Sequence, residues 1–146
     1  MNDEYKRLAA IEELKILSTI IGRIENAIYQ KQGWLLTLIT GLTLAVFKDN
    51  PFICKQQFLA ISIPITIVFY IADVVQRIPV HRAIKRSKKV ERSLEKNNSF
   101  DSPSISESLS KGKSIKDFFA IAKKFRVFAP YLGIIAAILI IYCIAP

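Results

Sequence analysis

The sequence predicts an all-α integral membrane protein with three transmembrane helices and further amphipathic helices in the cytoplasm. The chain is 51% hydrophobic yet 23% charged, and the two classes occupy separate blocks, which is typical of membrane proteins. Residues 76–126 hold 14 Lys and Arg against five acids, whereas residues 1–32 balance five basic with five acidic residues. Because Lys and Arg of short loops stay on the cytoplasmic side, we expect the N-terminus inside and the C-terminus outside.

Residues 1–32 are predicted to form a cytoplasmic amphipathic helix. Its apolar residues repeat at three- and four-residue spacing: Leu14, Leu17, Ile21, Ile24 and Ile28. Charged residues, Glu13 among them, are expected off this seam. The seam is too short for a free-standing coiled coil. Packing within the chain, packing between subunits and lying on the membrane surface therefore remain as interpretations.

Residues 33–75 are predicted to form a transmembrane hairpin, with spans at about 28–47 and 58–75. The first uninterrupted apolar stretch, 33–47, would rise only about 22 Å, so its helix is expected to begin near Ile28. The second span contains Pro64, which is predicted to kink it. Ser62 and Thr66 flank this proline and are expected to satisfy the carbonyls that the kink frees.

The remaining residues are predicted to alternate between basic cytoplasmic segments and one last span. Residues 76–96 read as a basic cytoplasmic helix and residues 97–114, which are rich in serine, as a flexible linker. Residues 115–126 combine phenylalanines with lysines, a pattern that suits the headgroup boundary. Residues 127–146 contain no charge and are predicted to form the third transmembrane helix.

Two predicted spans carry small residues at four-residue intervals, a pattern that lets helices approach closely in lipid. The residues are Gly33, Thr37, Gly41 and Ala45 in the first span and Ala129, Gly133 and Ala137 in the third. Two interpretations remain open. These faces either pack the three spans of one chain together or drive assembly of a homo-oligomer.

Polar residues near the inner end of the second span form the first candidate functional site. Tyr70 and Asp73 interrupt the apolar sequence there, and Arg77 follows Asp73 at a spacing of four. An ionisable residue inside a span is a functional candidate. A helix-end salt bridge that anchors the span, a proton or ion relay, and a gate or oligomer contact are the alternatives.

A basic surface is the second candidate. It consists of Arg82, Lys85, Arg86, Lys88, Lys89 and Arg92. Attraction to anionic lipids of the inner leaflet explains it together with topology. A nucleotide second messenger or another cytoplasmic signal, delivered by a sensor protein, is the alternative. No aromatic residues interleave these basic residues, so nucleic acid is not an expected partner.

The sequence does not indicate an enzyme, a metal site or a cofactor. It has no nucleophile triad pattern, no phosphate loop and no dinucleotide loop. Its two cysteines and single histidine, Cys54, Cys143 and His81, lack the spacing of a zinc site. Both cysteines are expected near the outer face. Two interpretations remain for them: they form a disulfide, or they serve as small apolar fillers.

One pattern carries a family resemblance: Ile24-Glu25-Asn26-Ala27, Lys31-Gln32-Gly33-Trp34 and Phe69-Tyr70-Ile71-Ala72-Asp73, followed by Arg82, Arg86 and Glu91. It resembles a group of small, mostly uncharacterised bacterial membrane proteins with a K-x-W…F-[WY]-x-x-D transmembrane hairpin. Its layout is similar to that of two-span SLATT-type antiphage effectors. The resemblance covers roughly residues 20 to 95, and the third span and the linker depart from it. It implies a membrane-disrupting effector that assembles on a cytoplasmic signal.

These observations lead to one expected function and two alternatives. We expect a small bacterial inner-membrane effector that oligomerises and permeabilises the membrane, plausibly in antiphage defence. The first alternative is an immunity protein that binds a pore-forming toxin in the membrane. The second is an accessory subunit of a membrane complex.

Overall fold

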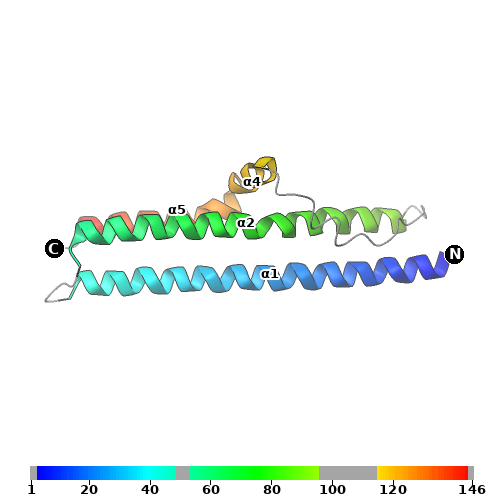
Figure 1. The fold of residues 1–146 in the computed structure, drawn as a ribbon, viewed down its shortest axis with the longest axis horizontal. Helices are drawn as coiled ribbons and strands as arrows, with labels where there is room; N and C mark the ends of the chain where they lie inside the picture. The colour runs from blue at the N-terminus through cyan, green and yellow to red at the C-terminus, as the bar shows by residue number, and fades with distance from the viewer. Residues whose placement is uncertain (1–2, 49–52, 96–114, 145–146) are drawn as a thin grey trace.

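The computed structural model describes residues 3–48, 53–95 and 115–144, and this part is all-helical, as predicted. Figure 1 shows its four helices: α1 (Asp3–Val46), α2 (Lys55–Glu95), α4 (Ile115–Ala122) and α5 (Phe125–Ile144). The predicted serine-rich linker, 97–114, lies outside the described residues. So do the last two residues of the predicted third span.

Two long antiparallel helices, α1 and α2, run the full length of the molecule (Figure 1). They have 44 and 41 residues, which corresponds to more than about 60 Å each. Helix α1 joins the predicted cytoplasmic helix to the predicted first span without a break. Helix α2 likewise continues from the predicted second span through Pro79 into the basic segment.

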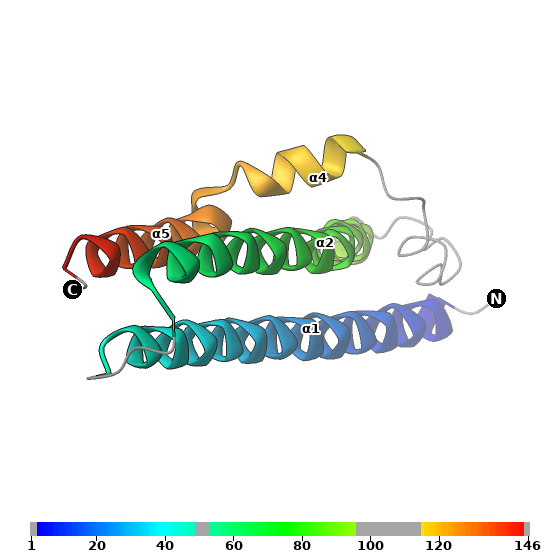
Figure 2. The ribbon, with the colours of Figure 1, turned by 60° about the vertical axis from the view of Figure 1, so that its left-hand side comes forward.

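The third long helix, α5, lies along only the first half of α2, and the short helix α4 lies over the middle of α2 (Figures 1 and 2). The molecule thus has two halves. The three-helix half comprises residues 28–46, 55–78 and α5, and the two-helix half comprises residues 3–27 and 79–95. The N-terminus lies at the far end of the two-helix half, and the C-terminus at the far end of the other half.

The three-helix half has an apolar core with contributions from α1, α2 and α5. Its buried members are Leu35, Ile39, Val46, Phe58, Tyr131 and Ile138. A smaller cluster lies at the inner end of this core, the end next to the two-helix half. It brings α4 onto α2 and α5 and contains Val74, Ile78, Ile121 and Val127. These two clusters fix α5 against α2 and place α4 beside the start of α5.

The two-helix half has a thin core in which α1 packs against α2 within the chain. Ala10 and Leu17 of α1 are fully buried, as is Ala83 of α2. The expectation that Glu13 lies off the apolar seam is wrong, because its residue exposure is only 2%. Glu13 lies one helical turn before Leu17 and therefore on the same face.

Two helices of the described residues, α2 and α5, are long and apolar enough to cross a membrane. Only 28% of the apolar window of α2 and 17% of that of α5 are buried, whereas the core helix of a soluble protein would be mostly buried. Helix α1 does not meet the same criterion. Polar residues immediately before its apolar stretch, Gln30, Lys31 and Gln32, lower its hydropathy.

The two small polar residues near Pro64 do something other than what the sequence predicts. Pro64 frees the carbonyl of Ala60, but the Thr66 hydroxyl donates to the carbonyl of Ser62, 2.8 Å away. Ser62 and Thr66 are both buried, and they lie one and two turns after the buried Phe58. Their small side chains therefore occupy the packed face of α2. The kink at Pro64 stays a prediction.

Candidate functional site

A buried carboxylate, Asp73, lies at the inner end of the apolar core and connects all three helices of that half. Its exposure is 2%. The Nε of Arg77 donates to Asp73 Oδ1 at 2.8 Å, in the pairing that the four-residue spacing predicts. Oδ2 accepts from the Gln32 side-chain amide of α1 and from the Tyr131 hydroxyl of α5, each at 3.2 Å. The charge of Asp73 is thus compensated within α2, while its neutral partners hold the helices together.

The Tyr70 and Tyr131 rings extend this polar site toward α4. Their centroids lie 5.3 Å apart in an edge-to-face arrangement, a favoured geometry for aromatic pairs. The Tyr70 hydroxyl donates to the carbonyl of Ala122 at 3.0 Å. That carbonyl belongs to the last residue of α4 and has no partner within its own helix. Tyr70 therefore caps α4 while it packs against α5.

A second buried ion pair joins α1 and α2 in the two-helix half. Arg86 Nε lies 2.7 Å from Glu13 Oε1, and its terminal nitrogen lies 3.2 Å from Oε2, a two-point contact. The side chains are only 9% and 1% exposed, respectively. Charges removed from water to this extent need such a partner. This pair therefore fixes the register of α1 on α2.

A third ion pair attaches α4 to α2. Arg82 lies 3.0 Å from Asp117 Oδ2, and the side chains remain 15% and 31% exposed. Two of the six residues of the predicted basic surface, Arg82 and Arg86, thus bind acidic residues of neighbouring helices. Lys85, Lys88 and Arg92 of that surface are exposed.

Sequence reasoning found Asp73 and Arg77 but missed four side chains that complete these contacts: Gln32, Tyr131, Glu13 and Asp117. Gln32 and Tyr131 were not singled out, because a lone amide and a tyrosine in separate spans show no common spacing. Glu13 was assigned to the wrong face. Its spacing of four residues from Leu17 would have identified it, since a charged residue on a buried helix face needs a buried partner.

The small residues of α1 and α5 point away from the packed core. Gly33, Thr37, Gly41, Gly133 and Ala137 are exposed, whereas Ala45 and Ala129 are half-buried. A Cβ atom built on Gly33, Gly41 or Gly133 would meet no other atom within 4 Å. These glycines therefore make no close helix contact within the described part of this chain.

The described residues offer no group of side chains suited to hold a metal ion. The thiols of Cys54 and Cys143 are both free and exposed. What the geometry provides is a set of polar connections between helices: one at the inner end of the core, one in the two-helix half and one at α4.

The pattern behind the family resemblance is met only loosely, because two residues rather than one separate Lys31 from Trp34. Comparison with protein-family models, with curated proteins and with solved structures finds no match to this chain.

Proposed function

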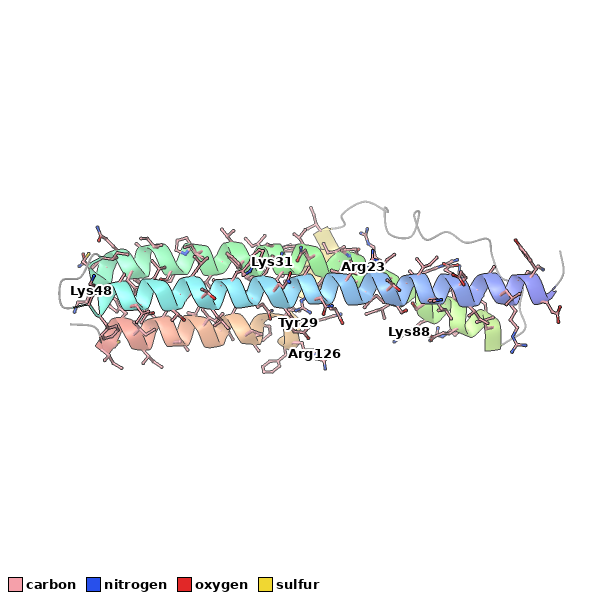
Figure 3. The ribbon with its side chains drawn as sticks, turned by 90° about the horizontal axis from the view of Figure 1, so that it is seen from below. Arg23, Tyr29, Lys31, Lys48, Lys88 and Arg126 are labelled. Atoms are coloured by element: carbon pink, nitrogen blue, oxygen red, sulfur yellow. The ribbon has the colours of Figure 1, made fainter. Side chains whose placement is uncertain are left out.

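We propose that this chain is a multi-pass protein of the bacterial inner membrane that self-associates and permeabilises the membrane. The three-helix half would span the bilayer and the two-helix half would extend into the cytoplasm, with the C-terminus outside. Residues 32–47, 56–72 and 127–144 contain no charged side chain. Figure 3 shows Lys48 at one end of this uncharged zone and Lys31 and Arg126 near the other. Basic residues at both boundaries suit a bilayer.

The outward side chains of the three-helix half support this placement. Many large apolar residues there are exposed: Leu36, Leu38, Leu44, Ile61, Ile67, Val68, Leu132, Leu139 and Ile140. In water such a surface would be an unusually large apolar patch. In lipid it is the ordinary outer face of a helical bundle.

One observation carries the proposal of self-association: beside exposed leucines such as Leu36, α1 presents one outward face of small residues where lipid would otherwise cover it. Gly33, Thr37 and Gly41 lie exposed on this face, with open space around both glycines. In lipid, helices with such faces are held by close packing against another helix. No helix of the described chain occupies the face, so we assign it to a second copy of α1. Several copies would bring threonine hydroxyls to a common axis and create a path for ions.

Asp73 serves as an anchor at the inner mouth of this assembly. It lies about 27 Å along α2 from the outer end of that helix at Lys55, which places it within the inner half of a hydrocarbon core about 30 Å thick. Arg77, Gln32 and Tyr131 occupy its oxygens, an arrangement that favours a fixed structural contact over a proton relay. A cytoplasmic signal acting on the two-helix half would reach this anchor through α1 and α2, and an antiphage role would follow if infection produces that signal.

The experiment compares glycine-to-leucine variants on α1 and α5. We expect the full-length chain in nanodiscs to form multimers by native mass spectrometry and to release dye from liposomes. Gly33→Leu and Gly41→Leu should each weaken self-association at least about tenfold, a cost near 1.4 kcal/mol for a lost close contact. Dye release should fall in parallel.

Gly133→Leu on α5 is the matched control, because it adds the same bulk to a face with equal open space. Leucine has the higher helix propensity, so neither change should weaken the helix itself. Equal losses from α1 and α5 variants would contradict the assignment to α1. A parent chain that is monomeric and leaves liposomes sealed would overturn the proposal and favour an immunity protein or an accessory subunit.

A further inference from the structure

Helix α4 is fixed to the inner end of the three-helix half by three kinds of contact. Phe118 and Ile121 pack against the cluster formed by α2 and α5. Arg82 binds Asp117 at 3.0 Å, and the Tyr70 hydroxyl binds the last carbonyl of the helix. The position of α4 relative to the spans is therefore determined on its inward side.

The opposite side of α4 and the turn into α5 present large apolar side chains outward. Ile115 and Phe125 are each 74% exposed, and Phe119 is 57% exposed. Ile115 and Phe119 are four residues apart and so share one face of α4. Of these side chains, that of Phe125 belongs to the first residue of α5, the helix that we place in the membrane.

Basic residues at the same place leave a local excess of positive charge. Lys123, Lys124 and Arg126 are all exposed, and Arg126 points away from the other helices (Figure 3). The acid of α4, Asp117, binds Arg82. The pKa of His81 on α2 also lies below its usual value of 6.5, first because the ring is partly buried and then because Lys124 and Lys85 repel its positive form, with Asp117 opposing them. Lys85 of α2 and the basic residues that follow α4 therefore both contribute positive potential beside His81.

We propose that Lys123, Lys124, Phe125 and Arg126, the α4–α5 corner, form a binding site for anionic phospholipid headgroups of the inner leaflet. The cations would contact phosphate and the Phe119 and Phe125 rings would enter the acyl boundary, as amphipathic segments do at such surfaces. A bilayer is the occupant because the corner directly precedes the uncharged α5. Arg82 and Arg86 of the predicted basic surface bind acids within the chain, whereas the three cations of the corner are exposed.

This inference rests on the proposed membrane insertion but not on self-association. The test uses the full-length Trp34→Phe/Phe125→Trp chain, which has a single tryptophan, in vesicles of brominated lipids that quench tryptophan. Brominated phosphatidylglycerol should outcompete brominated phosphatidylcholine at the corner at least about fivefold, the factor expected for one basic residue at an anionic surface. Lys123→Gln/Lys124→Gln/Arg126→Gln should reduce this preference to near onefold.

The matched control, Lys15→Gln/Arg23→Gln/Lys88→Gln, removes three exposed charges from the same proposed side of the membrane and should keep the preference. Equal loss in both triple variants, or no preference in the parent, would overturn the site. Absence of quenching by either lipid would instead contradict membrane insertion, and with it the proposed function.

The only histidine of the chain provides a second measurement that needs no tryptophan. Anionic headgroups at the corner should raise the His81 pKa, because they offset the repulsion from Lys124. The ring resonance would be titrated by NMR in phosphatidylcholine nanodiscs with and without phosphatidylglycerol. An equal pKa in both, or an equal rise in the corner triple variant, would count against the site.

Discussion

The two halves of the molecule use the same pair of helices, α1 and α2, but differ in the charge of the side chains they turn outward. In the three-helix half the exposed residues are mostly apolar, such as Leu44, Val68 and Leu139. In the two-helix half charged residues such as Lys15 and Lys88 are exposed, beside apolar ones such as Leu8. One continuous helix therefore changes the composition of its exposed surface along its length. The change occurs near Gln32 and Asp73, where the polar contacts begin.

The buried carboxylates of the two halves also differ in how their charge is compensated. Asp73 pairs with Arg77 of its own helix, and neutral donors connect it to α1 and α5. Glu13 pairs directly with Arg86 across the helix interface. In the three-helix half the connection is thus a set of hydrogen bonds added to an apolar core. In the two-helix half the ion pair supports a thin core, so its loss should have the larger effect.

The first prediction breaks the two-helix half. Arg86→Met removes the partner of Glu13, whose side chain is 1% exposed. A buried charge left alone typically costs about 3–5 kcal/mol. We expect a large fall in the melting temperature of the chain in detergent, measured by circular dichroism. The lost helix should be that of residues 3–27 and 79–95.

The double variant Glu13→Leu/Arg86→Met is the control for this prediction. It replaces both charges with apolar groups of similar size, and such replacements of buried pairs are often neutral or stabilising. The double variant should therefore recover most of the lost stability. A melting temperature as low as that of Arg86→Met alone would show that the packing of these side chains, rather than the charge, matters.

The second prediction weakens the three-helix half to a smaller degree. Asp73→Asn keeps an acceptor for Gln32 and Tyr131 but removes the charge that binds Arg77. Because Arg77 is 24% exposed, it can turn toward water or headgroups, and we expect a cost of about 1.5–3 kcal/mol, the value of a hydrogen bond to a charged group.

Tyr131→Phe isolates the link to α5 within the same site and should cost about 1 kcal/mol. Hydrogen exchange should rise first in α5 for this variant and leave residues 3–27 unchanged. Faster exchange in residues 3–27 instead would contradict an effect confined to α5.

The sequence predicts a large part of this comparison. The charge-free stretches and the apolar spacing of Leu17 and Ile28 locate the helices, since these patterns depend only on local periodicity. The Asp73–Arg77 pair follows from its spacing for the same reason. The other contacts join distant parts of the chain, as Tyr131 to Asp73 and Arg86 to Glu13 do, and no local pattern specifies which partners meet. The predicted cytoplasmic helix, 1–32, and first span, about 28–47, overlap, and α1 joins them without a break.

The third prediction concerns the contact that joins α4 to the two-helix half, the ion pair between Arg82 and Asp117. Both side chains are partly exposed, and such pairs contribute about 0.2–1 kcal/mol. Asp117→Asn should leave the melting temperature nearly unchanged but speed amide exchange in α4. Ile121→Ala serves as the comparison, because Ile121 is 2% exposed. It should release α4 more fully, and equal effects would show that the ion pair contributes as much as the packing.

The last prediction is a weak pH dependence at His81, close to the junction of the halves. Burial and then repulsion from Lys124 and Lys85 hold the pKa of His81 below 6.5. The unfolded chain then binds the proton more readily than the folded chain, so stability should decrease as the pH falls below about 6.5. NMR titration in phosphatidylcholine nanodiscs would give the pKa directly. Melting temperatures measured at about pH 5 and about pH 7.5 would give the linked change in stability.

Two variants separate the causes of this shift. His81→Gln should remove this contribution to the pH dependence of the melting temperature. Lys124→Gln should raise the pKa only partway toward 6.5, because burial is the larger cause and Lys85 remains. A pKa fully restored by Lys124→Gln would mean that the charge of Lys124, rather than burial of the ring, causes the shift.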